Sequence, residues 1–292
     1  MTDETKNVNI DNQADEFAAF IDMFLHPYRD GGAAIRKETF AKEYNPVERD
    51  MKAGSFTTTV YKVETEKHIF FLHGGAAVLG TNEFFNNTVC ALADRGFRVS
   101  IYEYPLAPEH DYTEINEAVY GCFKEIKSLY PGDEFHIWGD SAGVTFGLNL
   151  LVRLREEGDD SRPMKNVWVS PCINWDIDNP ECRKAAESDD TLVWEVMEAC
   201  SPKLAPAGNY RDPEVSPMYA DLSDLGTCYV TYSSKEMFWP DDEKFIRKLN
   251  ETEGTEAEKV YVCEGLFHDY VLQTDNLPEA VKALDEISEF LK

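Results

Sequence analysis

A serine lies between two glycines near the middle of the chain, in Gly139-Asp-Ser-Ala-Gly143. An apolar run ends at this pentapeptide, and a run compatible with a helix, 144–154, follows without a gap. The pattern predicts a strand, a sharp turn and a helix, with Ser141 at the apex. The flanking glycines let strand and helix approach closely, while the strained turn projects the hydroxyl outward. This favours Ser141 as a nucleophile over the alternative, a serine that caps an ordinary helix.

A serine that attacks an ester needs hydrogen-bond donors for the oxyanion of the tetrahedral intermediate. Consecutive glycines follow the apolar run that ends at Leu72, in the order His73, Gly74, Gly75. Because glycines let the backbone come close to the reacting oxygen, the N–H groups of Gly74, Gly75 and Ala142 are predicted as the donors. The alternative is a flexible glycine turn. His73 is expected to form structural hydrogen bonds rather than to act as a base.

One of the six histidines, His268, follows the last predicted strand, 259–263. Reactive side chains of a parallel sheet lie beyond the C-terminal ends of its strands. A neutral imidazole with a pKa near 6.5 suits a general base at neutral pH. Serine, acid, histidine is also a known chain order of a catalytic triad. We therefore predict His268 as the base.

The acid that orients this histidine is expected after the preceding strand, 228–232. Glu236 is the carboxylate nearest the end of that strand. Asp241 and Asp242 fall where a helix begins at Pro240, so helix capping and a favourable interaction with the helix dipole explain them equally well. A triad acid has to orient the imidazole from a position near a strand end. We predict Glu236 as the acid and keep Asp241 as the alternative.

The elements that must position these residues alternate between strands and helices. Strands are predicted at 57–63, 68–72, 98–102, 134–138, 167–170, 228–232 and 259–263, and helices at 82–96, 113–130, 144–154, 240–250 and 277–291. Such alternation indicates an α/β fold, with a mostly parallel central sheet flanked by helices.

Two segments depart from this alternation and are interpreted as a helical cap. Residues 174–216 are rich in prolines and acidic residues and contain a predicted helix near 191–200. Residues 1–55 contain apolar residues at helical spacing, as in 17–25, with a plain N-terminal extension as the alternative reading. We expect N-terminal cap helices in 1–55 and a catalytic domain in 56–292, with 174–216 as an inserted cap segment.

Composition restricts the classes of partner. The 292 residues suffice for one large domain, and the formal net charge of -27 argues against nucleic acid and anionic membranes as partners. No apolar run is long enough to span a bilayer, and the polar N-terminus does not resemble a signal peptide. The seven cysteines form no CxxC pair, and several of them, such as Cys228 and Cys263, lie within apolar runs and are expected to be reduced, buried thiols. A cytoplasmic location is expected.

These motifs together resemble the hormone-sensitive-lipase-like family of α/β-hydrolases, over about residues 60–292. The matching segments are His73-Gly-Gly75, Tyr104–Glu109, Gly139–Gly143, Ser170-Pro171 and Val215-Ser-Pro217. The resemblance implies an α/β-hydrolase fold with a helical cap, in which the segment from Tyr104 braces the oxyanion loop. Two features depart from the family pattern. Glu236-Met-Phe replaces the usual Asp-x-Leu, and Ala76-Ala77 follows the two glycines.

The residues and the resemblance predict a serine carboxylesterase for small, short-acyl esters. Ser141 would form an acyl-enzyme, His268 would carry the proton and Glu236 would hold the imidazole, with no metal or organic cofactor. Acetyl esterase, arylesterase and lactonase activities remain open within this class. The alternative is a receptor-like α/β-hydrolase fold that binds a ligand without catalysis. The oligomeric state is left open, with a homodimer among the arrangements considered.

Overall fold

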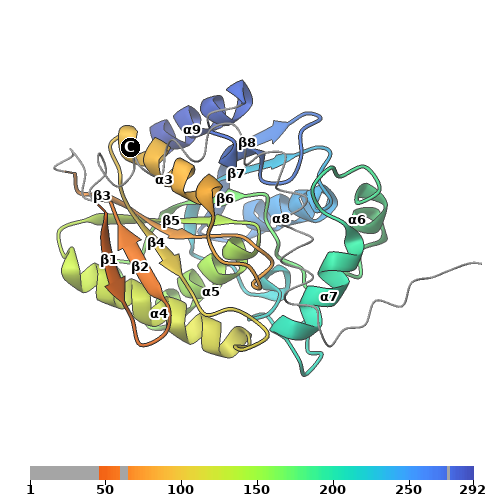
Figure 1. Ribbon diagram of the computed structural model, residues 1–292, viewed down its shortest axis with the longest axis horizontal. Helices are drawn as coiled ribbons and strands as arrows, with labels where there is room; N and C mark the ends of the chain where they lie inside the picture. Colours follow the sequence, from red (N-terminus) through yellow and green to blue (C-terminus); the bar gives the residue numbers. More distant parts are fainter. Residues whose placement is uncertain (1–45, 60–64, 275–276) are drawn as a thin grey trace, which may run out of the picture.

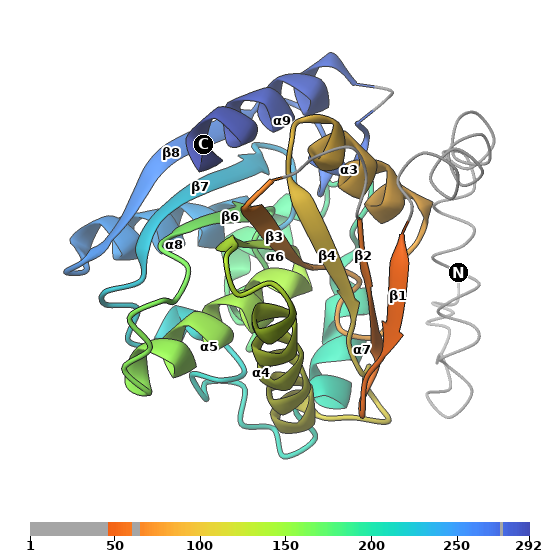
Figure 2. The ribbon, with the colours of Figure 1, turned by 90° about the vertical axis from the view of Figure 1, so that its left-hand side faces the viewer.

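An eight-stranded sheet forms the centre of the molecule, and helices cover both of its faces (Figures 1 and 2). The structure is a computed structural model that describes residues 46–59, 65–274 and 277–292. The strand order across the sheet is β1-β2-β4-β3-β5-β6-β7-β8. The strands are β1 (Val47–Asp50), β2 (Ser55–Thr58), β3 (Lys67–Leu72), β4 (Arg98–Glu103), β5 (Glu134–Asp140), β6 (Lys165–Val169), β7 (Gly226–Ser233) and β8 (Thr255–Cys263).

Parallel pairing dominates this sheet. β2 pairs antiparallel with β1 and β4, whereas the other neighbours, from β4 to β8, run parallel. The described helices are α3 (Glu83–Asp94), α4 (Tyr112–Leu129), α5 (Ala142–Glu156), α6 (Pro180–Ala185), α7 (Trp194–Leu204), α8 (Trp239–Glu251) and α9 (Pro278–Leu291). None of these is both long and apolar enough to cross a membrane. The predicted α/β class, with a mostly parallel sheet between helices, is confirmed.

Two apolar layers hold the helices to the sheet. α3 and α9 cover one face, and α4, α5 and α8 cover the other (Figure 2). Strand β3 contributes to both layers, because Ile69 and Phe71 lie in the first and Phe70 and Leu72 in the second. A strand that is buried on both faces reads as a continuous apolar run. That is the pattern from which this strand was predicted.

Helix α3 begins at a capped position close to the carboxyl end of β3. The side chain of Asn82 accepts a hydrogen bond from the N–H of Phe84 at 2.9 Å. An N-cap of this kind stabilises a helix by about 1 kcal/mol. The cap fixes the first turn of α3, and Phe84 and Phe85 in that turn line the cavity described below.

The structure describes the two segments that depart from the alternation, 174–216 and 1–55, to different extents. The segment 174–216 contains α6 and α7, of which α6 packs against α8 and α7 is the helix expected near 191–200. The sheet begins before residue 56, because β1 pairs with β2. The helical periodicity at 17–25 lies outside the described residues.

All seven cysteines are buried. Burial raises the pKa of Cys172 well above its ordinary value. Because the thiolate is the reactive form of cysteine, a buried thiol with a raised pKa is chemically inert. The cysteines are therefore packing residues of the core.

Candidate active site

Ser141 occupies a sharp turn between the end of β5 and the start of α5. Its φ of 48° and ψ of -121° lie in a region that residues other than glycine rarely adopt. A Cβ atom at Gly143 would lie 2.0 Å from the carbonyl oxygen of Leu72, and one at Gly139 would lie 2.8 Å from the backbone of Val144. Both positions therefore require glycine, as inferred from the sequence.

His268 reaches Ser141 from the loop after β8. The two side chains are buried, and His268 Nε2 lies 2.9 Å from Ser141 Oγ. They are 127 positions apart in the chain, so the fold brings them together. A hydroxyl that donates to an imidazole nitrogen at this distance can lose its proton to that nitrogen as it attacks.

Glu236 lies on the opposite side of the imidazole, in the loop after β7. Its side chain is 0% exposed, and its Oε1 lies 3.6 Å from His268 Nδ1. Neither of these two atoms has a hydrogen-bond partner among the described residues. A buried polar atom without a partner costs about 1–3 kcal/mol, so a small closing movement of the pair is favoured.

The other oxygen of Glu236 is held in place. Oε2 accepts hydrogen bonds from Ser170 Oγ at 2.8 Å and from the N–H of Ser233 at 3.0 Å. Ser170 comes from the end of β6, and Ser233 ends β7. Two neighbouring strands thus fix the carboxylate, which leaves Oε1 directed at the imidazole.

Asp241, the alternative acid, is engaged elsewhere. Its Oδ1 accepts a hydrogen bond from Asn179 Nδ2 at 2.6 Å, and its Oδ2 accepts one from Asn174 Nδ2 at 3.2 Å. Lys244 Nζ lies 3.3 Å from Oδ1. These contacts tie the first turn of α8 to the segment 174–216. The structure therefore brings Glu236, and not Asp241, to His268.

A second carboxylate, Asp269, lies beside the same imidazole and was not recognised in the sequence. Its Oδ2 is 3.3 Å from His268 Nε2, and its N–H donates to Ser170 Oγ at 3.0 Å. Burial raises the pKa of Asp269 to about 7, with the charge of Glu236 adding to the rise and His268 opposing it. The only signal in the sequence was its position directly after the histidine. That signal is weak, because side chains of adjacent residues often diverge.

The charge of His268 reflects these neighbours. Burial lowers the pKa of the imidazole, but the carboxylates of Asp269 and Glu236 outweigh it and raise the pKa to about 10. A smaller contribution comes from Asp189. The site thus stabilises the imidazolium that forms when His268 accepts a proton.

The loop after β3 lies against Ser141, because a Cβ atom at Gly74 would lie 3.0 Å from Ser141 Cβ. Gly75 has a φ of 108°, and a Cβ atom there would lie 2.6 Å from the carbonyl oxygen of Leu79, so only glycine fits. The N–H of Gly74 donates to Asp140 Oδ2 at 2.7 Å and is therefore already engaged. Ala142 is the first residue of α5, where an N–H has no partner within the helix. Of the three predicted donors, Gly74 is therefore the one whose N–H already has a partner.

His73 and Tyr104 brace this loop. His73 Nδ1 donates to the carbonyl oxygen of Gly74 at 2.6 Å, and burial lowers the pKa of its imidazole to about 4. The two rings stack with centroids 4.2 Å apart, and Tyr104 Oη donates to the carbonyl oxygen of His73 at 2.6 Å. His73 is therefore a structural residue, as expected, and Tyr104 supports the loop as the resemblance implies.

A cavity of about 160 Å³ opens at Ser141. Three parts of the chain line it: the loop after β3 with α3, the segment 174–216, and the loop after β8. The lining residues include Gly75, Leu79, Asn82, Phe84, Phe85, Asp190, Thr191, Leu192, Val196, Met197, Phe267, Leu272 and Gln273. The segment 174–216 thus forms one wall of the cavity, as a cap would.

Asp189 joins this wall to the loop that carries Glu236. Its Oδ2 accepts a hydrogen bond from the N–H of Met237 at 2.7 Å. Its Oδ1 accepts hydrogen bonds from the N–H groups of Thr191 at 2.8 Å and Leu192 at 3.1 Å. The same carboxylate therefore fixes two cavity-lining residues and the residue next to Glu236. Nothing in the sequence marked Asp189, because the contact spans 48 positions.

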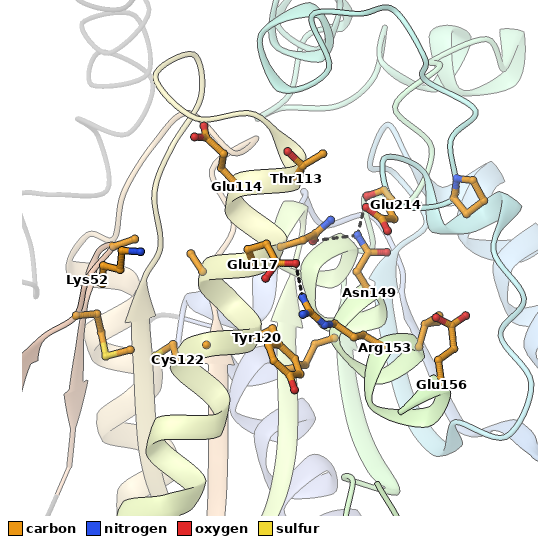
Figure 3. A pocket seen from close by; sticks show the side chains of 18 of the residues that line it. Lys52, Thr113, Glu114, Glu117, Tyr120, Cys122, Asn149, Arg153, Glu156 and Glu214 are labelled. Atoms are coloured by element: carbon orange, nitrogen blue, oxygen red, sulfur yellow. Dashed lines mark hydrogen bonds and ion pairs between the residues drawn. The ribbon is translucent and has the colours of Figure 1, made fainter. Parts of the chain in front are cut away.

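A larger cavity, of about 780 Å³, lies between α4 and α5 (Figure 3). Glu117 and Arg153 form an ion pair at 2.7 Å across it, and Asn149 donates to the carbonyl oxygen of Glu214 at 2.7 Å. None of the predicted site residues lines this cavity. The smaller cavity at Ser141 is therefore the candidate active site.

Fold and site together define the class of α/β-hydrolase enzymes. A family model described as alpha/beta hydrolase fold matches residues 69–272, and the chain belongs to this family. An esterase of Acinetobacter venetianus is 30% identical over 226 residues, which make up 76% of this chain and 73% of that protein. Esterase LipU of Mycobacterium tuberculosis is 25% identical, with 78% of each chain covered.

Solved structures agree with this assignment at the level of the fold. A hyperthermophilic esterase from the archaeon Pyrobaculum calidifontis superimposes with a TM-score of 0.81 at 19% identity, over 98% of this chain and 94% of that one. An esterase from the bacterial hormone-sensitive lipase family gives a TM-score of 0.78 at 20% identity, over 95% and 97% of the two chains. The resemblance seen in the sequence is confirmed, and the chain is a hydrolase.

Proposed function

We propose that the protein is a serine carboxylesterase that hydrolyses small esters with short acyl groups. The observation that carries this proposal is the hydrogen bond of 2.9 Å between Ser141 Oγ and His268 Nε2, at the wall of the cavity of about 160 Å³. A receptor-like fold would have no need to keep this pair intact. The esterase names of the sequence relatives support the same activity.

The reaction begins with attack of Ser141 Oγ on the ester carbonyl, while His268 Nε2 accepts the hydroxyl proton. The oxyanion of the tetrahedral intermediate accepts hydrogen bonds from the N–H groups of Gly75 and Ala142. Gly74 holds the loop in place through its hydrogen bond to Asp140. Its N–H can donate to the oxyanion only if it shares its hydrogen between the oxyanion and Asp140. One oxyanion donor is typically worth about 3–4 kcal/mol of the barrier.

The imidazolium then gives its proton to the leaving alkoxide oxygen, and the C–O bond to the alcohol breaks. The acyl group remains on Ser141 as an ester. Water attacks this acyl-enzyme with His268 again as the base, which releases the acid and restores the serine hydroxyl. Glu236 keeps the proton on Nδ1, so that Nε2 is the nitrogen that faces Ser141.

The charge of Asp269 predicts the pH dependence of this reaction. Only neutral His268 can accept the serine proton, so kcat/KM is expected to rise with pH towards the raised pKa of about 10. Asp269→Asn removes a negative charge 3.3 Å from Nε2, which lowers that pKa. The acid limb of the kcat/KM profile is then expected to move to lower pH by about one unit or more.

Asp285→Asn is the matched control for the pH profile. Asp285 is exposed and pairs with Arg95, and it lies on α9 rather than at the cavity. Its variant is expected to keep the wild-type acid limb. An acid limb that stays in place in Asp269→Asn, or that moves to higher pH, would show that this carboxylate does not set the charge of His268.

We infer the preference for short acyl groups from the size of the cavity. The space at Ser141 is about 160 Å³, and Phe85, Met197 and Leu272 are among the bulky side chains around it. In a series of p-nitrophenyl esters, kcat/KM is expected to fall steeply beyond short chains. Met197→Ala removes atoms from the α7 wall and is expected to raise the octanoate-to-acetate ratio of kcat/KM by about tenfold. A wild-type optimum at octanoate would contradict the proposal.

We also propose that cap helices lie within 1–55 ahead of β1, and that the catalytic domain comprises 56–292 together with β1 and the start of β2, with 174–216 as an inserted cap segment. Support comes from α7, which lines the cavity through Val196 and Met197. Strand β1 extends the sheet of the catalytic domain to residues ahead of 56. We also propose a cytoplasmic location, for which the seven buried thiols are the support.

A further inference from the structure

Asp242 is a buried carboxyl group in the first turn of α8, the helix that begins shortly after Glu236. Its side chain is 0% exposed, and neither of its oxygens has a hydrogen-bond partner among the described residues. Helix capping does not account for it, because no side chain caps the start of α8. The adjacent Asp241 differs, because two asparagines and a lysine hold its carboxylate. A buried, ionised carboxylate without partners is costly, so its surroundings have to neutralise Asp242.

These surroundings favour the protonated form of Asp242. Burial is the largest cause that raises its pKa, and Glu236 raises it further, both by its charge and because the two groups lie within reach of a hydrogen bond. The charges of Asp241 and Asp269 add to the rise, so the pKa lies well above its ordinary value. Two ionised carboxylates have no hydrogen to share and repel each other in a buried space. A proton on Asp242 turns this repulsion into a hydrogen bond.

The other titratable groups around Asp242 do not supply a positive charge in place of that proton. Tyr232, Cys172 and Cys182 lie near it, and burial raises the pKa of all three, so they stay neutral. Lys244 on the same helix pairs with the adjacent aspartate at 3.3 Å. The proton is therefore the means by which this carboxyl group is neutralised, as in other buried acids that donate a hydrogen bond at neutral pH.

The carboxylate of Glu236 can accept the hydrogen of Asp242. A carboxylate accepts up to about four hydrogen bonds. Oε2 of Glu236 accepts two, from Ser170 and Ser233. Oε1 has none among the described residues, although it lies 3.6 Å from His268 Nδ1. When Asp242 donates to this carboxylate, the two groups share one proton and carry one negative charge in place of two.

That single charge has to face the imidazole for the triad to work. A further hydrogen bond to Glu236 limits the rotation of its carboxylate and so keeps Oε1 directed at Nδ1 of His268. On the basis of the proposed esterase function, we propose that Asp242 is a positioning residue of the triad, which as a neutral acid donates a hydrogen bond to Glu236 and holds it against His268. Neither Asp242 nor Glu236 lines the cavity, so the effect falls on the chemical step and not on substrate binding.

Two variants of Asp242 test this role by kinetics. Asp242→Leu removes the donor and keeps a branched side chain, and kcat with p-nitrophenyl acetate at pH 8 is expected to fall about tenfold, with KM within about twofold of the wild type. Asp242→Asn keeps a donor at the same place and is expected to restore most of that loss. Wild-type kcat in the folded leucine variant, or an asparagine variant as slow as the leucine variant, would overturn the inference and leave the esterase function standing.

Infrared spectroscopy tests the shared proton without relying on turnover. At pH 8 the wild type is expected to show the C=O stretch of a protonated carboxyl group that is absent from Asp242→Asn and changes frequency in Glu236→Gln. Asp241→Asn is the matched control and is expected to keep this band unchanged, because Asp241 pairs with Lys244. A band with this behaviour would support the hydrogen bond whether or not the protein hydrolyses the esters tested. If the wild type lacks the band, or if Glu236→Gln leaves it unchanged, the inference is overturned.

Discussion

Ser141→Ala is expected to lower kcat for ester hydrolysis by about 10⁶-fold, the loss typical when a nucleophilic serine is removed from a triad. The hydroxyl is the atom that forms the acyl-enzyme, so no other group can replace it. Residual hydrolysis would come from the oxyanion donors Gly75 and Ala142 and from binding alone. The measurement is kcat with p-nitrophenyl acetate at pH 8.

This loss has to be separated from unfolding. Alanine at position 141 would adopt the same backbone conformation as serine, with φ near 48°, so the strain of the turn is unchanged. The thermal unfolding midpoint is therefore expected to stay close to that of the wild type. Ser128→Ala is the matched control, because Ser128 is exposed and bonds only to a carbonyl oxygen of its own helix. If Ser141→Ala keeps wild-type turnover, Ser141 is not the nucleophile.

Glu236→Gln is expected to lower kcat by about 10³- to 10⁴-fold, the effect known for an amide in place of a triad carboxylate. Glutamine keeps the size of the side chain but removes the charge that stabilises the imidazolium. Its amide nitrogen also allows the wrong tautomer of His268, with the proton on Nε2. The hydrogen bonds from Ser170 and Ser233 can still reach the amide oxygen, so folding is expected to survive.

Asp241→Asn is the matched comparison for this variant. Asp241 bonds to Asn174 and Asn179 and to Lys244, all away from the imidazole. Its loss is expected to lower stability by about 1–2 kcal/mol and to leave kcat within about threefold of the wild type. The reverse pattern, with Asp241→Asn inactive and Glu236→Gln active, would show that the triad uses the other acid.

The fold could be predicted from the sequence because local patterns and global topology agree. β3 reads as an unbroken apolar run because both of its faces are covered, and α5 follows Ser141 without a gap. The glycines at 139 and 143 likewise indicated the sharp turn at Ser141. Each lies where a Cβ atom would collide with backbone of another element.

The parts of the site that escaped prediction depend on contacts between distant segments. Asp189 and Met237 lie in different loops, and Ser170 joins Glu236 to Asp269 only after three strands are in place. The hydrogen bond from the Gly74 N–H to Asp140 also escaped prediction, because it joins residues 66 positions apart. A sequence shows which side chains follow a strand, but not which of them share a hydrogen-bond partner.

The central claim, that Ser141 is the activated nucleophile of an esterase, is tested most directly by covalent labelling. The folded protein is treated with a fluorophosphonate at pH 8, and intact mass followed by peptide mapping identifies the modified residue. We expect one adduct per chain, on Ser141, together with loss of p-nitrophenyl acetate hydrolysis in proportion to labelling, and no adduct in Ser141→Ala. An unlabelled, folded wild-type protein, or an adduct on another residue that abolishes hydrolysis, would contradict this account.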